Sequence, residues 1–106
     1  MSKLFLKEDP TLADLQAYVQ DMIAERGFSD TIPQRFMLLL EEAGEFARSA
    51  RRLAGLKFAD DTHKSEAADE AADVLIIFLG LCNQLGIDLE QAFRDKEEKN
   101  KQRTWK

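Results

Sequence analysis

Two short acidic motifs contain the side chains of this 106-residue sequence that are best suited to chemistry. In the motif EEAGE, Glu42 lies three residues before Glu45. In the motif EAAD, Glu70 lies three residues before Asp73. Side chains three residues apart in an α-helix lie on nearly the same face. Two such helices packed antiparallel would bring four carboxylates together, and oxygen ligands of this kind suit a hard divalent cation, chiefly Mg²⁺ with Mn²⁺ as a substitute.

The same motifs can also be interpreted as solvated acidic helix faces, in which Glu45 pairs with Arg48 three residues later. Two features favour a metal site instead. Glu42 interrupts an apolar line along its segment, and Asp73 directly precedes the apolar run at residues 74–79. Both carboxylates are therefore expected to be partly buried. Neighbouring buried carboxylates need a cation or protons to offset their charge.

The helices that must position these acids are predicted from signals at their ends. The first covers about residues 12–26, because Thr11 and Asp14 can form a capping box before it and Gly27 can end it. The second covers about residues 33–54. It begins at a proline, which suits the first turn of a helix, and it stops before a glycine.

The third helix is predicted over about residues 66–85, with Ser65 as its cap and Gly86 as the left-handed residue that ends it. Its middle, residues 74–79, is apolar on every side. A helix that is apolar all round is normally enclosed all round. We therefore expect this helix to be central.

The fourth helix is predicted to start at Asp88, with Gln91 three residues later to complete a capping box, and to become strongly charged toward Lys101. Residues 55–64 are predicted to be a loop, and this loop includes His63, the only histidine. No segment alternates apolar and polar residues, so a sheet is not expected.

Composition favours one globular domain over residues 1–106, with 44% apolar and 33% charged residues. The predicted fold class is all-α, as an antiparallel four-helix bundle. A chain this short cannot cover the apolar middle of the third helix on all sides. The core is therefore expected to be shared between subunits.

Charge and cysteine content restrict the partners. The net charge is -5, and residues 94–106 carry six basic and three acidic side chains, which leaves residues 1–93 at -8. An acidic body argues against binding to nucleic acid polymers, whereas the basic tail can hold a small anion. The single cysteine, Cys82, excludes an intramolecular disulfide. The sequence has no apolar run typical of a signal peptide or a membrane span, so we expect a cytoplasmic protein without membrane contact.

The two acidic motifs, taken together with their spacing, resemble those of the MazG-type nucleoside triphosphate pyrophosphohydrolases. The signature of that family is EExxE, a spacer and then ExxD, and here the spacer has 24 residues. The flanking segments LLLEEAGEFARSARR and EAADEAADVLIIFLGLCNQLGIDLEQAF and the tail DKEEKNKQRTW are also similar to family segments. The likeness covers about residues 12–106.

This resemblance implies an all-α, Mg²⁺-dependent enzyme that hydrolyses (deoxy)nucleoside triphosphates to the monophosphate and pyrophosphate. Enzymes of this type with a single domain often remove non-standard or surplus nucleotides. By position, the resemblance implies these metal ligands: Glu42, Glu45, Glu70 and Asp73. Glu41 would be a supporting or water-activating group.

The basic tail also resembles the family. Lys96, Asn100 and Arg103 match a K-x-x-x-N-x-x-R pattern that serves the phosphates and the nucleotide in relatives. Lysine and arginine can stabilise the charge of a triphosphate, while an amide can contact the sugar or the base. The alternative is a solvated C-terminal helix. Relatives further suggest a homo-oligomer, as a tetramer built from two dimers.

Two other classes remain open at this point. A di-metal carboxylate bundle of different chemistry also uses inward glutamates, but its di-iron form needs Glu-x-x-His motifs. A non-catalytic, acidic helical oligomer could instead act as an interaction module. The aromatic residues are better explained by core packing than by base stacking: Tyr18, Phe28, Phe36, Phe46 and Phe58. The sequence does not select the base or the sugar of the nucleotide.

Overall fold

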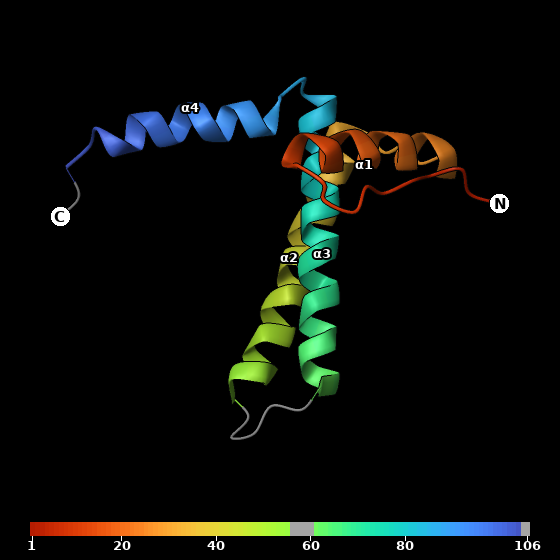
Figure 1. Cartoon of the computed structure of the whole chain (residues 1–106). Helices are drawn as coiled ribbons and strands as arrows, with labels where there is room; N and C mark the ends of the chain where they lie inside the picture. The colour runs from red at the N-terminus through yellow and green to blue at the C-terminus, as the bar shows by residue number, and fades with distance from the viewer. Residues whose placement is uncertain (56–60, 105–106) are drawn as a thin grey trace.

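The structure is a computed structural model that describes residues 1–55 and 61–104, and these residues form helices without any strand. The predicted all-α class is confirmed. The helices are α1 (Leu12–Arg26), α2 (Ile32–Gly55), α3 (Asp61–Gln84) and α4 (Leu89–Lys101), as Figure 1 shows. Part of the predicted loop at residues 55–64, with Phe58, lies outside the described residues.

The start of α1 follows the predicted capping chemistry. The Thr11 hydroxyl accepts a hydrogen bond from the Asp14 amide, and the Asp14 carboxylate accepts one from the Thr11 amide. Gly27 ends the helix with a φ of 70°, in the left-handed region that favours glycine. A second capping box, between Thr31 and Gln34, starts α2 and was not predicted.

The start of α3 differs from the prediction. The helix begins at Asp61, five residues before the predicted position, so Ser65 is not a cap and His63 lies in the helix rather than in a loop. This first part of the helix carries no glycine or proline, and Ala67 within it is buried. Helix α3, which packs along α2, therefore extends beyond its local cap signal into a segment without a helix breaker.

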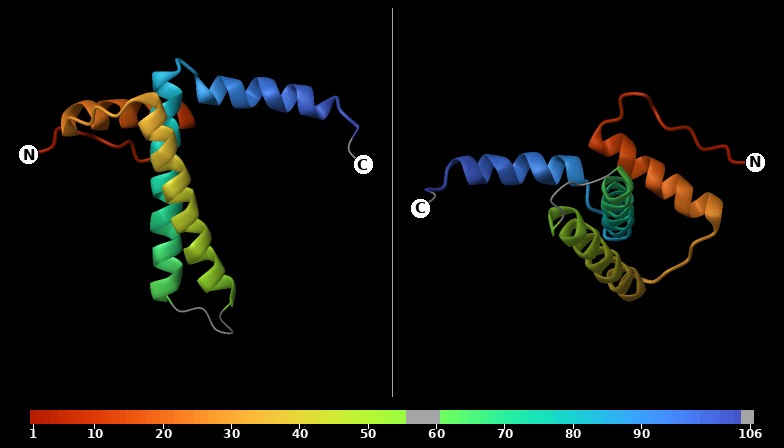
Figure 2. Two further views of the ribbon diagram at one scale, coloured as in Figure 1. Left: turned by 180° about the vertical axis from the view of Figure 1, so that it is seen from behind. Right: turned by 90° about the horizontal axis from the view of Figure 1, so that it is seen from below.

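The four helices of one chain do not form the expected antiparallel bundle. Helices α2 and α3 pack as an antiparallel pair, α1 crosses them, and α4 leaves the end of α3 with a bend of 94° (Figures 1 and 2). Gly86, with a φ of 69°, makes this change of direction possible. Asp88 caps α4 through the Gln91 amide, but the Gln91 side chain donates to Asp95, so the predicted capping box is only half formed.

A buried glutamine fixes this corner. The Gln16 side chain donates to the Ile87 carbonyl and accepts from the Leu89 amide at 3.1 Å. These two hydrogen bonds satisfy backbone groups in the connection between α3 and α4. This explains why a polar side chain lies beside the core. The core contains a buried cluster of Val19, Met22 and Leu79, and Ala67, Leu81 and Cys82 are also buried.

The single chain leaves much apolar surface uncovered. Its radius of gyration is 16.5 Å, whereas a compact chain of this length has about 13 Å. Its accessible surface is 8354 Å², whereas a compact monomer of 12.1 kDa has roughly 6,000 Å². Leu75 and Phe78 in the apolar middle of α3 are about 40% exposed. The predicted enclosure of residues 74–79 is therefore incomplete within one chain.

Among the described residues, no single helix is both long enough and apolar enough to cross a membrane; α3 and α4 meet that test only as a pair joined across their bend.

Candidate metal centre

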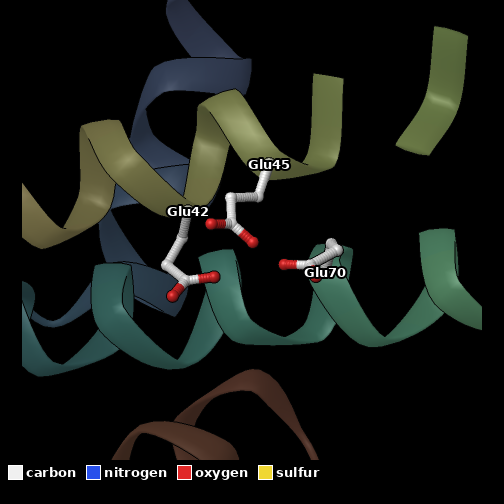
Figure 3. A group of neighbouring side chains, drawn as sticks. All are labelled: Glu42, Glu45 and Glu70. Carbon is white, nitrogen blue, oxygen red and sulfur yellow. The ribbon is translucent and has the colours of Figure 1, made fainter. Parts of the chain in front are cut away.

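Three glutamates from two helices meet at the middle of the α2–α3 pair. Glu42 and Glu45 come from α2 and Glu70 comes from α3, and each contributes a carboxylate oxygen to a group whose members lie within 4.8 Å of one another (Figure 3). Glu42 and Glu70 are half-buried, whereas Glu45 is exposed. The i, i+3 spacing predicted this convergence on α2, and the antiparallel packing supplies the third carboxylate.

The electrostatics of this group favour a bound cation. Burial raises the pKa of Glu42, and the nearby charges of Asp73 and Glu70 raise it further, as does a hydrogen bond between the Glu42 and Glu70 side chains. Within the described part of the chain, the Glu70 Oε2 atom is buried and has no hydrogen-bond partner. A buried oxygen without a donor is costly, and a metal ion would satisfy it. These residues therefore fit a hard divalent cation.

Asp73 is placed differently from the prediction. Its side chain is exposed rather than partly buried, and it is not one of the three acids that converge. The prediction relied on the apolar run that follows it, but one chain encloses that run only in part, since Leu75 and Phe78 are about 40% exposed. Asp73 nevertheless lies near enough for its charge to raise the pKa of Glu42.

The remaining predicted site residues are not brought to this group within one chain. Glu41 is exposed on α2. Lys96 and Asn100 lie on α4, and Arg103 follows it. Glu70 is 14 residues from the end of α3, which is about 21 Å along the helix, and α4 then bends away (Figure 1). These tail residues cannot reach the glutamates of their own chain.

A buried arginine was missed from the sequence. Arg35 on α2 is only 6% exposed, although a charged residue on an amphipathic helix is normally expected in solvent. The signal was its position seven residues before Glu42, because residues at this spacing share a helix face. The same face of α2 therefore carries one cation and, two turns later, the carboxylate group.

Comparison with known proteins relates this arrangement to nucleotide hydrolysis. The family described as phosphoribosyl-ATP pyrophosphohydrolase matches residues 9–100. A relative described as dATP/dGTP diphosphohydrolase, from Cyanophage S-2L, is 33% identical over 93 residues, which cover 88% of this chain and 72% of the relative. The family match spans both acidic motifs and most of α4.

Proposed function

Because this chain belongs to the phosphoribosyl-ATP pyrophosphohydrolase family, within the MazG-like superfamily, and is a nucleotide pyrophosphohydrolase, we propose that it hydrolyses (deoxy)nucleoside triphosphates to the monophosphate and pyrophosphate in a Mg²⁺-dependent reaction. The observation that carries the metal dependence is the convergence of Glu42, Glu45 and Glu70, together with the unsatisfied buried oxygen of Glu70.

In this proposal the carboxylates of α2 and α3 hold the metal ion, with Asp73 as a fourth ligand beside the three that converge. Bound Mg²⁺, or Mn²⁺ in its place, would neutralise the charge of the polyphosphate and lower the pKa of the water molecule that attacks it. Glu41 lies next to Glu42 in the chain and supports the site or takes the proton of the water. The ligand group contains oxygen donors alone, which favours Mg²⁺ over the iron of histidine-containing di-metal bundles.

A second copy of the chain completes the proposed site. The chain exposes apolar side chains on α2, including Met37 and Leu40, which are about 70% exposed. Covering them requires another subunit. In a homo-oligomer, proposed here as a tetramer built from two dimers, Lys96, Asn100 and Arg103 of one copy reach the acidic group of another. The charge of the tail, opposite to that of the body, supports this pairing.

The proposed role is the removal of non-standard or surplus nucleotides in the cytoplasm. A second candidate substrate is phosphoribosyl-ATP, which the description of the matching family favours. Each candidate substrate carries a phosphate anhydride, and the same carboxylate group could hold the metal ion for its hydrolysis. A panel of dNTPs, NTPs and phosphoribosyl-ATP separates the two.

The test is a comparison of Glu70→Gln with Glu66→Gln in a pyrophosphate-release assay. Glu66 is exposed and lies one turn earlier on α3, so it controls for the loss of one charge on the same helix. Glu70→Gln should lose activity by at least roughly 10–100-fold, and Glu66→Gln should not. Equal activity in the two variants would contradict the proposed metal centre.

A further inference from the structure

A small apolar pocket lies between α1, α2 and α3, beside the carboxylate group. Its volume is about 260 Å³, and its walls include Met22 and Ile23 of α1, Leu38 of α2, Ile77 of α3, and Phe28 from the connection between α1 and α2. Whole drug-sized ligands occupy roughly 300–1,000 Å³. This pocket is therefore suited to one ring system of a ligand rather than to a complete nucleotide.

The position of the pocket relates it to the proposed phosphate site. Leu38 lies four residues before Glu42, and Ile77 lies four residues after Asp73. On each helix this separation is one turn, about 6 Å, on the same face. The pocket and the carboxylates therefore lie next to each other along the α2–α3 pair. The sugar of a nucleotide can connect a base in the pocket to phosphates at the carboxylates.

One charged side chain in the pocket has unused hydrogen-bonding capacity. The Arg35 side chain is 7% exposed, and its Nη2 atom lies 3.7 Å from Asp30 Oδ2, which is longer than a hydrogen bond. Within the described residues, this contact is the one ion pair of the guanidinium group. Because an arginine carries five N–H donors in a fixed plane, most of its donors are available to a ligand.

The fold holds Arg35 in place. Gly80 lets α3 pass close to it, since a Cβ at this glycine would lie 3.2 Å from Ile23 Cδ1 and 3.5 Å from Arg35 Cδ. The Gln84 side chain also donates to the Asp30 carbonyl at 2.9 Å, which ties the connection before α2 to the end of α3. These contacts restrict the aliphatic part of Arg35 and the connection before α2, and so keep the guanidinium at the pocket wall.

We propose that this pocket binds the base of the substrate and that Arg35 selects guanine; this inference rests on the proposed function. The planar fork of an arginine pairs with two adjacent acceptors, and guanine presents N7 and O6 on one edge. Adenine presents a donor beside N7, and thymine presents one acceptor beside a methyl group. Cytosine offers N3 and O2, but its single ring would leave part of the apolar wall uncovered.

The first test uses wild-type protein and measures kcat/KM for dGTP, 7-deaza-dGTP, dATP, dCTP and dTTP by pyrophosphate release. The 7-deaza compound replaces the N7 acceptor with a C–H group and changes little else. We expect dGTP to be the best substrate and 7-deaza-dGTP to be roughly tenfold worse, the effect of one hydrogen bond to a charged donor. Equal rates on these two nucleotides, or a preference for dCTP or dTTP, would overturn the inference.

The second test compares Arg35→Met with Arg26→Met, since Arg26 is an exposed arginine of α1. Arg35→Met should lower kcat/KM for dGTP by roughly 5- to 100-fold, leave dTTP almost unchanged, and abolish the penalty for 7-deaza-dGTP. A uniform loss on all nucleotides would assign Arg35 a structural role and overturn the inference. Hydrolysis that does not depend on the base overturns this inference alone, whereas hydrolysis of no nucleotide overturns the proposed function as well.

Discussion

Replacing Glu42 with glutamine should stabilise the protein in the absence of metal and remove its stabilisation by Mg²⁺. Glu42 is one of three acids whose carboxylate oxygens lie within 4.8 Å of one another, and it is half-buried. The substitution keeps the shape of the side chain and removes its charge. It therefore eliminates two of the three pairwise repulsions in the group, those with Glu45 and Glu70.

The size of the effect follows from Coulomb's law. Two ionised carboxylates 4.8 Å apart repel by about 0.9 kcal/mol at the dielectric constant of water and by about 3.5 kcal/mol at an effective value of 20. Protonation sets an upper limit, because neutralising a carboxyl group with an ordinary pKa of 4.5 costs about 3.4 kcal/mol at pH 7. Glu42→Gln should thus raise the free energy of unfolding by about 1–3 kcal/mol without metal.

The dependence on pH follows from the raised pKa of Glu42, which burial and the neighbouring acids cause. A carboxyl group with a raised pKa in the folded state favours folding when it is protonated. This contribution is complete below the ordinary pKa of 4.5 and is lost as the pH rises through the folded-state value. The Tm of the wild type should therefore drop increasingly below the Tm of Glu42→Gln as the pH is raised from about 4.5 toward neutrality.

The assay is thermal unfolding at one fixed protein concentration, in EDTA and in millimolar Mg²⁺, with Glu66→Gln as the control. Each kcal/mol should change Tm by roughly 4–8 °C in a domain of this size. A ligand at 100 times its Kd stabilises by about 2.7 kcal/mol, so Mg²⁺ should raise the Tm of wild type and control clearly but not that of Glu42→Gln. The reasoning is refuted if Glu42→Gln melts no higher than the control in EDTA at pH 7, or if it keeps the full response to Mg²⁺.

Four further predictions concern the rest of the proposed site and the oligomer. Asp73→Asn should lower kcat by at least roughly 10–100-fold while the metal-free protein melts no lower than wild type at neutral pH; near-normal activity with a full Mg²⁺ response would remove Asp73 from the ligands. The double variant Lys96→Ala, Arg103→Ala should raise KM for the triphosphate by roughly tenfold with unchanged helicity in circular dichroism. At substrate concentrations far below KM, an equal mixture of that double variant and Glu42→Gln should reach up to about a quarter of wild-type activity if subunits exchange at random, because one site of each mixed dimer is then intact. No gain over the separate variants under proven exchange would show that the tail of one copy does not serve the acids of another. Met37→Glu with Leu40→Glu should dissociate the oligomer in light scattering, and a wild type that is already an active 12.1 kDa monomer would contradict the shared core.

The acidic group was predictable because its spacing is a property of one helix at a time. Glu42 and Glu45 are three positions apart, which places both on one face whatever surrounds the helix. Pairing with Glu70 needed one assumption, that α2 and α3 are antiparallel, and the short connection between them makes that arrangement the simplest one. The cap of α1 was predictable for the same reason, since Thr11 and Asp14 interact locally.

The parts that were wrong depend on distant contacts. The start of α3 is set by packing on α2, so the local cap signal at Ser65 was misleading. The exposure of Asp73 follows from an apolar run that one chain encloses only in part. Arg35 was overlooked because its burial depends on Gly80, 45 positions later in the sequence, and on the walls that α1 supplies.

The most direct test of the central claim is an analysis of the products of dGTP hydrolysis by the wild-type protein, by anion-exchange chromatography, with Mg²⁺ and with EDTA. Cleavage between the α and β phosphates, supported by the carboxylates of α2 and α3, predicts dGMP and pyrophosphate in equal amounts with Mg²⁺ and no turnover in EDTA. Formation of dGDP and orthophosphate, or turnover that persists in EDTA, would contradict it.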